Sequence, residues 1–317
     1  MQKMSKRIVF FGNERIATGT TTNNLVLRQL IEDDYDITAI VVNNEQVNGN
    51  HKVRKLEIAD IAEEHGILLL SPDKPVDIAN QLRDFRPEAA VLVAYGKIVP
   101  KSIIDIFPAG IINVHPSLLP KHRGPIPLES AILAGEQQTG LSLMSLAKEM
   151  DAGPVYAQTI VSLNGTETKQ QLANDLLEIG AAMLHELLPG ILEDNVVALP
   201  QDHQAATYDS RITKQDGIID WSKPAKQLER EIRAYAGWPR SRTTLGGLEV
   251  IVTQSHAVPS QTTDAAPGGL DIVSDIGHLG VITARGTLWI DRLQPVGKKE
   301  MTAAEFIRGY GQRLMNT

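Results

Sequence analysis

Cysteine is absent from the 317 residues of this chain. Its absence excludes disulfide bonds, a thiolate nucleophile and every zinc or iron–sulfur site built on cysteine. Long apolar runs are also missing, since no stretch approaches the roughly 20 apolar residues that cross a membrane. The first residues, "MQKMSKRIVFFGN", contain too short an apolar run for the core of a signal peptide. We therefore expect a cytoplasmic protein that does not bind a membrane.

The chain also lacks an excess of positive charge, because its formal net charge is -7 at pH 7. From residue 207 to the C-terminus there are 14 Lys and Arg against 12 Asp and Glu, whereas the preceding residues contain 17 against 26. The acidic N-terminal part argues against general binding to polyanions. The mildly basic last third permits a local nucleic-acid surface.

Strand-like and helical patterns alternate along the first 115 residues. Apolar strands separated by amphipathic helices are typical of a parallel sheet covered on both faces, so we expect an α/β, Rossmann-like, mostly parallel sheet with helices on both faces. The expected strands are residues 7–12, 35–44, 67–72, 88–96 and 111–115, and the expected helices are residues 25–34, 54–66, 77–87 and 168–188. No Gly-x-Gly-x-x-Gly follows the first strand, so a dinucleotide cofactor is not expected.

The last third has a different pattern. One helical segment is followed by many short β-type runs with glycine turns, which favours a small barrel or sandwich. Before it lies a polar, proline-punctuated stretch with little periodicity. We therefore expect a catalytic domain over residues 1–189, a linker over residues 190–207 and a second domain over residues 208–317.

Three polar residues collect at strand ends or in a nearby loop: Asn113, His115 and Asp151. Asn113 and His115 are two residues apart on a strand and so point to one side of it. An amide can stabilise an oxyanion, an imidazole can move a proton, and a carboxylate can orient it. No Gly-x-Ser-x-Gly nucleophile elbow is present, which indicates direct transfer to a substrate nucleophile. On spacing alone, a strand leaving the core and a simple turn account for such residues more often than a catalytic site does.

Three stretches resemble those of the formyltransferases that use 10-formyltetrahydrofolate. They read "VAYGKIVP" from Val93, "NVHPSLLPKHRG" from Asn113 and "QQTGLSLMSLAKEMDAGPVYAQ" from Gln137. Asn, His and a downstream Asp are the catalytic set of that superfamily, and Ser-Leu-Leu-Pro is its folate-site signature. The resemblance implies that 10-formyltetrahydrofolate is the co-substrate and that no metal is required.

Two further stretches narrow the resemblance to the methionyl-tRNA formyltransferase family. They read "YDSRITKQDGIIDWSKPAKQLEREIRAYAGWPRS" from Tyr208 and "LQPVGKKEMTAAEFIRGY" from Leu293, and both are similar to the second domain of that family. The resemblance covers most of the chain, from Val91 to Tyr310. It implies a C-terminal barrel of OB type that helps to hold the tRNA, in a protein that acts as a monomer.

The resemblance implies a role for each residue of the catalytic set. Asn113 would hydrogen-bond the formyl oxygen and its developing anion. His115 would polarise that centre or shuttle a proton. Asp151 would position His115 and receive, through water, the proton lost by the attacking amine. The turn after the strand and an earlier backbone segment would shape the folate pocket, through Ser117, Leu118, Leu119, Pro120, Ala94, Tyr95 and Gly96.

The N-terminal part departs from the family pattern. Where the family usually reads Phe-x-Gly-Thr-Pro-x-Phe, this chain reads "FFGNERIATG" from Phe10. The loop that touches the acceptor stem reads "NNEQVNGNHKVRKLE" from Asn43, which is less basic than usual. We expect these changes to affect recognition of the aminoacyl end and to leave the folate chemistry intact. The candidate tRNA contacts are Lys52, Arg54, Lys55, Arg240, Lys298 and Lys299.

Two other functions remain open. A formyltransferase that acts on an amino-sugar nucleotide would share the catalytic set and the fold, although the segments "GWPRS" and "GKKEMTAAEFIRGY" argue against it. A non-catalytic tRNA-binding protein on the same scaffold would have no need of all three catalytic residues. We therefore expect transfer of a formyl group to methionyl initiator tRNA, which supplies N-formylmethionyl-tRNA for translation initiation.

Overall fold

The computed structural model describes residues 6–16, 18–43, 56–258, 266–273 and 277–315. The chain separates into two compact units. The first unit comprises Met1–Pro127, Gln137–Leu163 and Gln170–Ser210, and the second comprises Leu128–Glu136, Asn164–Lys169 and Arg211–Thr317. In the part of the chain that is described, no helix combines the length and the apolar character that crossing a bilayer requires.

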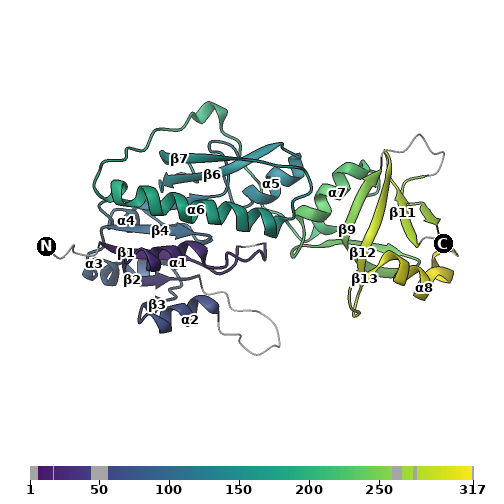
Figure 1. Ribbon diagram of the computed structural model, residues 1–317, viewed down its shortest axis with the longest axis horizontal. Coiled ribbons are helices and arrows are strands. Elements are labelled where there is room, and N and C mark those ends of the chain that lie inside the picture. Colours follow the sequence, from purple (N-terminus) through teal and green to yellow (C-terminus); the bar gives the residue numbers. More distant parts are fainter. Residues whose placement is uncertain (1–5, 17, 44–55, 259–265, 274–276, 316–317) are drawn as a thin grey trace. The chain divides into compact units, whose positions relative to one another are not determined.

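The first unit contains a seven-stranded sheet (Figure 1). Its neighbouring strands are parallel from β3 to β5, whereas β6 and β7 run antiparallel to their neighbours. In spatial order the strands are β3 (Leu68–Leu70), β2 (Asp36–Val41), β1 (Arg7–Gly12), β4 (Ala89–Val93), β5 (Ile111–His115), β6 (Gln138–Ser145) and β7 (Val155–Ser162). The predicted Rossmann-like sheet is confirmed.

Helices connect these strands. They are α1 (Leu25–Glu32), α2 (Glu57–Glu64), α3 (Ala79–Asp84), α4 (Lys101–Ile104), α5 (Pro127–Ala134) and α6 (Lys169–Leu192). The helix predicted over residues 77–87 is shorter than expected: a 3₁₀ turn (Pro75–Ile78) precedes α3. Proline at the start of that turn fixes φ and lacks an N–H to donate, which suits the first position of a helical turn.

The two faces of β5 have different surroundings. Ile111 packs in an apolar cluster with Leu82 of α3 and Ile103 of α4. Gly180 of α6 lies against Val114, which points to the opposite face of the strand because side chains alternate. Asn113 and His115 therefore share the face of Ile111, away from α6, and lie toward the carboxyl end of the strand.

The segment 190–207, predicted to be a linker, lies within the first unit. Its last residue, Thr207, forms three hydrogen bonds with the loop that follows β5. The N–H of Thr207 donates to the carbonyl of Pro120 at 3.2 Å. The hydroxyl of Thr207 accepts from the backbone N–H of His122 at 2.8 Å, and its carbonyl accepts from the N–H of Arg123 at 2.9 Å. These partners are about 85 residues apart in the chain, so a local pattern could not indicate the contact.

The second unit contains an antiparallel sheet that forms a half-barrel, as predicted for the C-terminal part. In spatial order its strands are β10 (Leu270–Val273), β11 (His278–Ile282), β12 (Thr287–Pro295), β9 (Leu248–Val258) and β8 (Ser241–Leu245), and β13 (Met301–Thr302) pairs with β12. Figure 1 shows α7 (Ala225–Ala234) beside β9. Leu228 and Ile232 of α7 and Phe306 of α8 (Ala303–Leu314) fill the core of this unit.

A buried ion pair ties together two segments of the second unit. Lys169 Nζ lies 3.2 Å from Glu129 Oε1 of α5, and the side chains are 2% and 1% exposed. Burial lowers the pKa of Lys169, and the carboxylate of Glu129 opposes that shift. Each charge therefore compensates for the burial of the other. Removing one partner should destabilise the fold more than replacing both with apolar side chains.

Substitution of one member of this pair should destabilise the protein strongly. Lys169→Met should lower the free energy of unfolding by about 3 kcal/mol because Glu129 stays buried without its partner, and adding Glu129→Leu should restore most of the loss. Calorimetric Tm values of the whole protein measure both effects. The exposed pair Lys101–Asp105 provides the control, since Lys101→Met should change stability by less than about 1 kcal/mol. A Lys169→Met protein as stable as the Lys101→Met protein would contradict this interpretation.

Candidate active site

Asn113 and His115 lie toward the carboxyl end of β5, an interior strand of the first sheet. In β5, Asn113 is in register with Leu92 of β4 and Met144 of β6, and His115 with Ser142 of β6. Their exposed fractions are 6% and 5%. Among the described residues no hydrogen bond engages the amide of Asn113, which leaves its donors for a bound molecule.

The ring of His115 is held by the loop that follows β5. Its Nε2 lies 3.1 Å from the carbonyl oxygen of His122, which can only accept, so Nε2 carries a proton. Nδ1 is then the ring atom whose protonation can change. It faces Asp151, with 3.9 Å between Nδ1 and Oδ1. That separation exceeds a hydrogen bond, and a polar atom about 2.8 Å from both could bridge it.

Asp151 occupies the turn between β6 and β7 in a left-handed conformation, with φ of 49°. Its Oδ2 accepts a hydrogen bond from the backbone N–H of Gly124 at 2.8 Å, which leaves Oδ1 directed at His115. Gly124 has φ of +124°, and a Cβ there would lie 3.0 Å from the carbonyl oxygen of Asp209. Glycine is therefore required at the position that orients this carboxylate.

The backbone of the Asp151 turn is fixed by Gln201. Its Nε2 donates to the carbonyls of Asp151 and Gly153 at 2.8 and 2.6 Å. Its Oε1 accepts from Arg123 Nε at 3.1 Å and Nη2 at 2.7 Å. Arg123 is only 1% exposed and also donates to the hydroxyl of Tyr208 at 2.7 Å. Gln201 thus joins the carboxylate turn to a buried guanidinium.

Sequence reasoning missed Arg123 and Gln201. Arg123 stands beside the quoted Ser-Leu-Leu-Pro turn, but a basic residue in a polar loop indicates solvent exposure rather than burial. Gln201 lies in the stretch predicted to be a linker, where no periodicity marks a partner. Only the tertiary contact between segments 78 residues apart reveals the pair.

The Ser-Leu-Leu-Pro turn is fastened to β6 and β7. Ser117 is fully buried and its hydroxyl donates to the carbonyl of Lys121 at 2.7 Å. Ser142 donates to the carbonyl of Ser117 and accepts from the N–H of Leu119, while Gln158 donates to the carbonyl of Leu119. The Leu119–Pro120 peptide bond is cis. Leu118 packs against Gly140 of β6.

The segment Ala94–Gly96 follows β4 directly. Ala94 and Gly96 have φ of 53° and 75°, so the chain turns sharply there. The side chain of Tyr95 points into the core, where its ring meets that of Phe11 at 5.2 Å. Burial raises the pKa of Tyr95 to about 12. Tyr95 can therefore meet a ligand through its backbone and not through its phenol.

The residues predicted to contact tRNA fall into two groups. Arg240, Lys298 and Lys299 belong to the second unit, and all three are exposed. Arg240 Nε donates to the carbonyl of Gly237 at 3.2 Å. Lys52, Arg54 and Lys55 lie outside the described residues.

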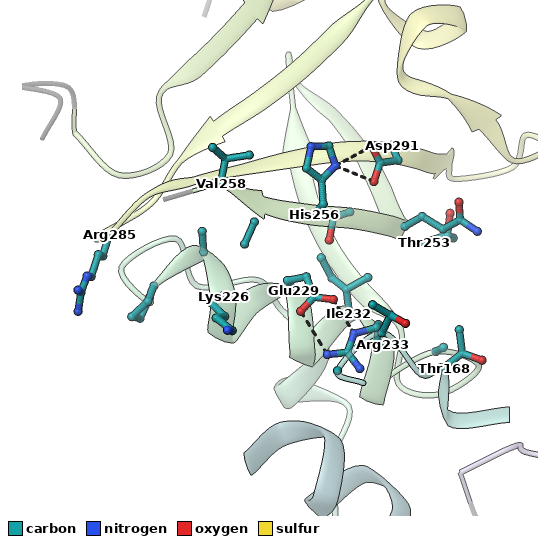
Figure 2. Close-up of a pocket in the computed structure, with 18 residues that line it drawn as sticks. Thr168, Lys226, Glu229, Ile232, Arg233, Thr253, His256, Val258, Arg285 and Asp291 are labelled. Atoms are coloured by element: carbon teal, nitrogen blue, oxygen red, sulfur yellow. Dashed lines mark hydrogen bonds and ion pairs between the residues drawn. The ribbon is translucent and has the colours of Figure 1, made fainter. Parts of the chain in front are cut away.

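A cavity of about 850 Å³ lies in the second unit, between α7 and β9 (Figure 2). Figure 2 shows His256 paired with Asp291 and Arg233 paired with Glu229. None of the residues predicted from the sequence lines this cavity. The predicted catalytic set therefore does not belong to this cavity. Within the described ranges no three His, Asp or Glu side chains gather as a metal site would require.

Comparison with protein families gives two matches. Residues 6–188 match the formyl transferase family, and residues 211–311 match the formyl transferase C-terminal domain. The chain is 36% identical to the methionyl-tRNA formyltransferase of Roseiflexus castenholzii over 98% of this chain and 99% of that protein. It is also 36% identical to the methionyl-tRNA formyltransferase of Geobacillus thermodenitrificans, over 97% and 95%.

Solved structures share the fold at low sequence identity. The methionyl-tRNA formyltransferase from Clostridium thermocellum gives a TM-score of 0.54 at 16% identity, over 79% of this chain and 93% of that one. WlaRD, a sugar 3N-formyl transferase, gives 0.67 at 17% identity, over 93% and 99%. HypX from Aquifex aeolicus in complex with tetrahydrofolic acid gives 0.64 at 17% identity. That match covers 98% of this chain and 47% of HypX, so the chain spans about half the length of that relative.

Loss of the buried guanidinium should release the Asp151 turn and the segment 190–207. Arg123→Met should lower the free energy of unfolding by about 3 kcal/mol, because it leaves Gln201 Oε1 buried without a donor. Limited proteolysis under native conditions should then cut within residues 190–207 faster than in the unmodified protein. Arg28→Met is the matched control, since the guanidinium of Arg28 is 46% exposed and meets Glu57 at the surface. Equal cleavage rates in the two variants would show that Arg123 does not hold this segment.

Proposed function

The chain belongs to the methionyl-tRNA formyltransferase family, and from that premise we propose which of its residues carry the reaction. The enzyme transfers a formyl group from a formyl-tetrahydrofolate to the α-amino group of methionyl initiator tRNA. We propose that the donor is the 10-formyl isomer and that the enzyme works as a monomer in the cytoplasm, where aminoacylated tRNA is used.

One arrangement supports the assignment of the site: an unpartnered amide, an imidazole and a carboxylate meet at the carboxyl end of the central strands. Ligands of open α/β sheets bind at that edge. Asn113 offers two N–H donors in a site from which most water is excluded, and His115 and Asp151 lie within reach of one bridging atom. The chain has no cysteine, and the hydroxyls of Ser117 and Ser142 both donate to backbone carbonyls. The set therefore suits transfer of an acyl group directly between two substrates.

Asn113 is proposed to bind the oxygen of the formyl group. When the amine attacks the formyl carbon, a nitrogen–carbon bond forms and the carbonyl electrons move onto that oxygen. A donor fixed in place before the reaction stabilises the new anion without reorganisation, and this term is often the largest in acyl transfer. The bond from the formyl carbon to N10 of the folate then breaks, and N10 leaves with the electron pair.

Proton movement is assigned to His115 and Asp151. The amine must be neutral to attack, and its nitrogen loses one proton as the new amide forms. We propose that this proton passes through a water molecule in the 3.9 Å gap between His115 Nδ1 and Asp151 Oδ1. The leaving N10 gains one proton, so no net proton is released by the transfer. Because Oδ2 is held by Gly124, only Oδ1 takes part in this step.

The donor is proposed to rest between the Ser117–Pro120 turn and the Ala94–Gly96 backbone. Both segments are held rigidly from outside the site: the turn by Ser142 and Gln158, and the backbone by contacts with Asn13. Gly96 is exposed, with only the amide of Asn43 near the place where a Cβ would lie. The polar edge of a pteridine ring can hydrogen-bond to such uncovered backbone. Leu118 and Leu119 supply apolar surface beside it.

The assignment of the acceptor is tested by offering two acceptors. The protein is incubated with 10-formyltetrahydrofolate and either methionyl initiator tRNA or an amino-sugar nucleotide. Formylmethionine should appear with the tRNA, and the sugar should stay unmodified. Transfer to the sugar and none to the tRNA would favour the rival enzyme, and binding of tRNA without transfer to either would favour the non-catalytic protein.

Substitution of the catalytic set should lower turnover and spare tRNA binding. Asn113→Ala should reduce kcat by about 10²- to 10³-fold because the oxyanion loses its donor. Asp151→Asn should reduce kcat by about 10²-fold or more because the amide cannot accept the proton. Quench-flow rates and filter-binding affinities measure the two properties. Asp105→Asn, at an exposed carboxylate of the same unit, is the control and should leave both unchanged. A near wild-type kcat in either variant would contradict the catalytic role proposed for that residue.

Charge reversal at Lys298 and Lys299 should weaken tRNA binding. Each phosphate contact contributes to the salt dependence of affinity, so the double Lys298→Glu/Lys299→Glu variant should show a smaller slope of log K against log salt, by about 1 to 2. The double variant Lys74→Glu/Lys101→Glu changes the net charge equally on the first unit and is the matched control. Identical slopes in the two double variants would show that Lys298 and Lys299 do not contact the tRNA.

A further inference from the structure

Asn13 stands at the end of β1, where this chain departs from the usual Thr-Pro of its family, and it is 8% exposed. Its side chain makes three hydrogen bonds to backbone. Nδ2 donates to the carbonyls of Ala94 and Tyr95, both at 2.9 Å, and Oδ1 accepts from the N–H of Asn43 at 2.8 Å. An asparagine amide has two N–H donors, and here both are occupied. Asn13 therefore acts on other segments of the protein and not on a ligand.

The contacts of Asn13 begin where the sheet ends. β4 stops at Val93 and β2 at Val41, and Val42 still donates to the carbonyl of Leu70 at 2.9 Å, so the strand bonding ends just before Ala94 and Asn43. Ala94 has φ of 53°, a left-handed conformation that costs a non-glycine residue about 1 kcal/mol or more. A conformation of that kind persists only where its surroundings impose it. The two bonds from Asn13 supply that restraint.

Asn13 is itself held firmly. The hydroxyl of Thr22 donates to the carbonyl of Asn13 at 3.0 Å, and the N–H of Thr22 donates to the carbonyl of Glu14 at 2.8 Å. The carboxylate of Glu14 accepts from the N–H of Glu57 at the start of α2, at 2.6 Å. The dipeptide Asn13-Glu14 is thus hydrogen-bonded to residues that follow β2 and β4 and to the first residue of α2.

We propose that Asn13 is a positioning residue for binding of the formyl donor. It sets the shape of the Ala94–Gly96 backbone against which, under the proposed function, the folate rests. The donor should therefore bind less tightly when the two Nδ2 bonds are lost. The chemical step should change little, because Asn113, His115 and Asp151 have no hydrogen bond to Asn13.

Two variants separate the bonds of Asn13. Asn13→Asp is isosteric and keeps an acceptor for Asn43, but it replaces both donors with an oxygen that faces two carbonyls. Asn13→Ala removes all three bonds. If the Nδ2 bonds carry the effect, the two variants should weaken donor binding to a similar extent. Asn13→Thr restores the residue usual in the family, and its hydroxyl can donate one bond, so its effect should be smaller.

The probe is tetrahydrofolate, whose binding can be measured by calorimetry without tRNA. Asn13→Asp and Asn13→Ala should raise its Kd by about 10-fold, as expected for the loss of one to two net hydrogen bonds. The KM for 10-formyltetrahydrofolate should rise in parallel. The kcat at saturating donor should stay within about 3-fold of wild type, and the KM for methionyl-tRNA should be unchanged in Asn13→Asp.

Ile37→Ala is the control for a purely structural role. Ile37 is buried near the amino end of β2, so its truncation should lower Tm without changing the Kd of tetrahydrofolate. An unchanged Kd in folded Asn13→Asp protein overturns the proposal, as does a fall in kcat at constant Kd or a larger loss of affinity in Asn13→Thr than in Asn13→Ala. If instead the proposed function is wrong, the unmodified protein itself will transfer no formyl group, so the two failures can be told apart.

Discussion

The placement of Asp151 opposite His115 is the constraint on which the rest of the site depends. The Nε2–H of His115 donates a hydrogen bond to the carbonyl of His122, so Nδ1 is the ring nitrogen that faces the carboxylate. One oxygen of Asp151 is bound by the N–H of Gly124, and the other is left for chemistry. The proposed proton relay across a separation of 3.9 Å would tolerate little movement of either group. The bonds made by Gly124, Gln201 and Arg123 hold the Asp151 turn in place, as the proposed relay requires.

The sheet positions only part of this arrangement. β5 delivers Asn113 and His115 to the carboxyl edge, but Asp151 and the Ala94–Gly96 backbone lie beyond the last ladder bonds. Beyond the strand ends, buried amide side chains hold the backbone, because each amide can donate to two carbonyls at once. Gln201 donates to the carbonyls of Asp151 and Gly153, and Asn13 donates to those of Ala94 and Tyr95. Each of these two loops is thereby tied to a side chain from a distant segment of the chain.

Much of the fold could be predicted from the sequence because the buried strands of a parallel sheet are rich in apolar residues, and β1 and β4 are nearly continuous apolar runs. The spacing of Asn113 and His115 also revealed a shared face. What could not be predicted are contacts between distant segments that lack any period. Gln201 lies in a stretch that was predicted to be a linker. Asn13 lies in a loop whose sequence differs from the family pattern, and that difference does not predict its contacts. Arg123 was missed because arginine is seldom buried, and the Gln201 acceptor that permits its burial is 78 residues away.

The central claim is that the formyl group passes directly from folate to the amine, with no covalent intermediate on the protein. A single-turnover reaction with donor labelled in its formyl group tests it most directly. The protein is quenched at intervals from milliseconds to completion, and label is counted in donor, protein and tRNA. Label should leave the donor and enter methionyl-tRNA at one rate, with none on the protein at any time and none transferred when tRNA is omitted. Label that appears on the protein before it reaches the tRNA would contradict the account.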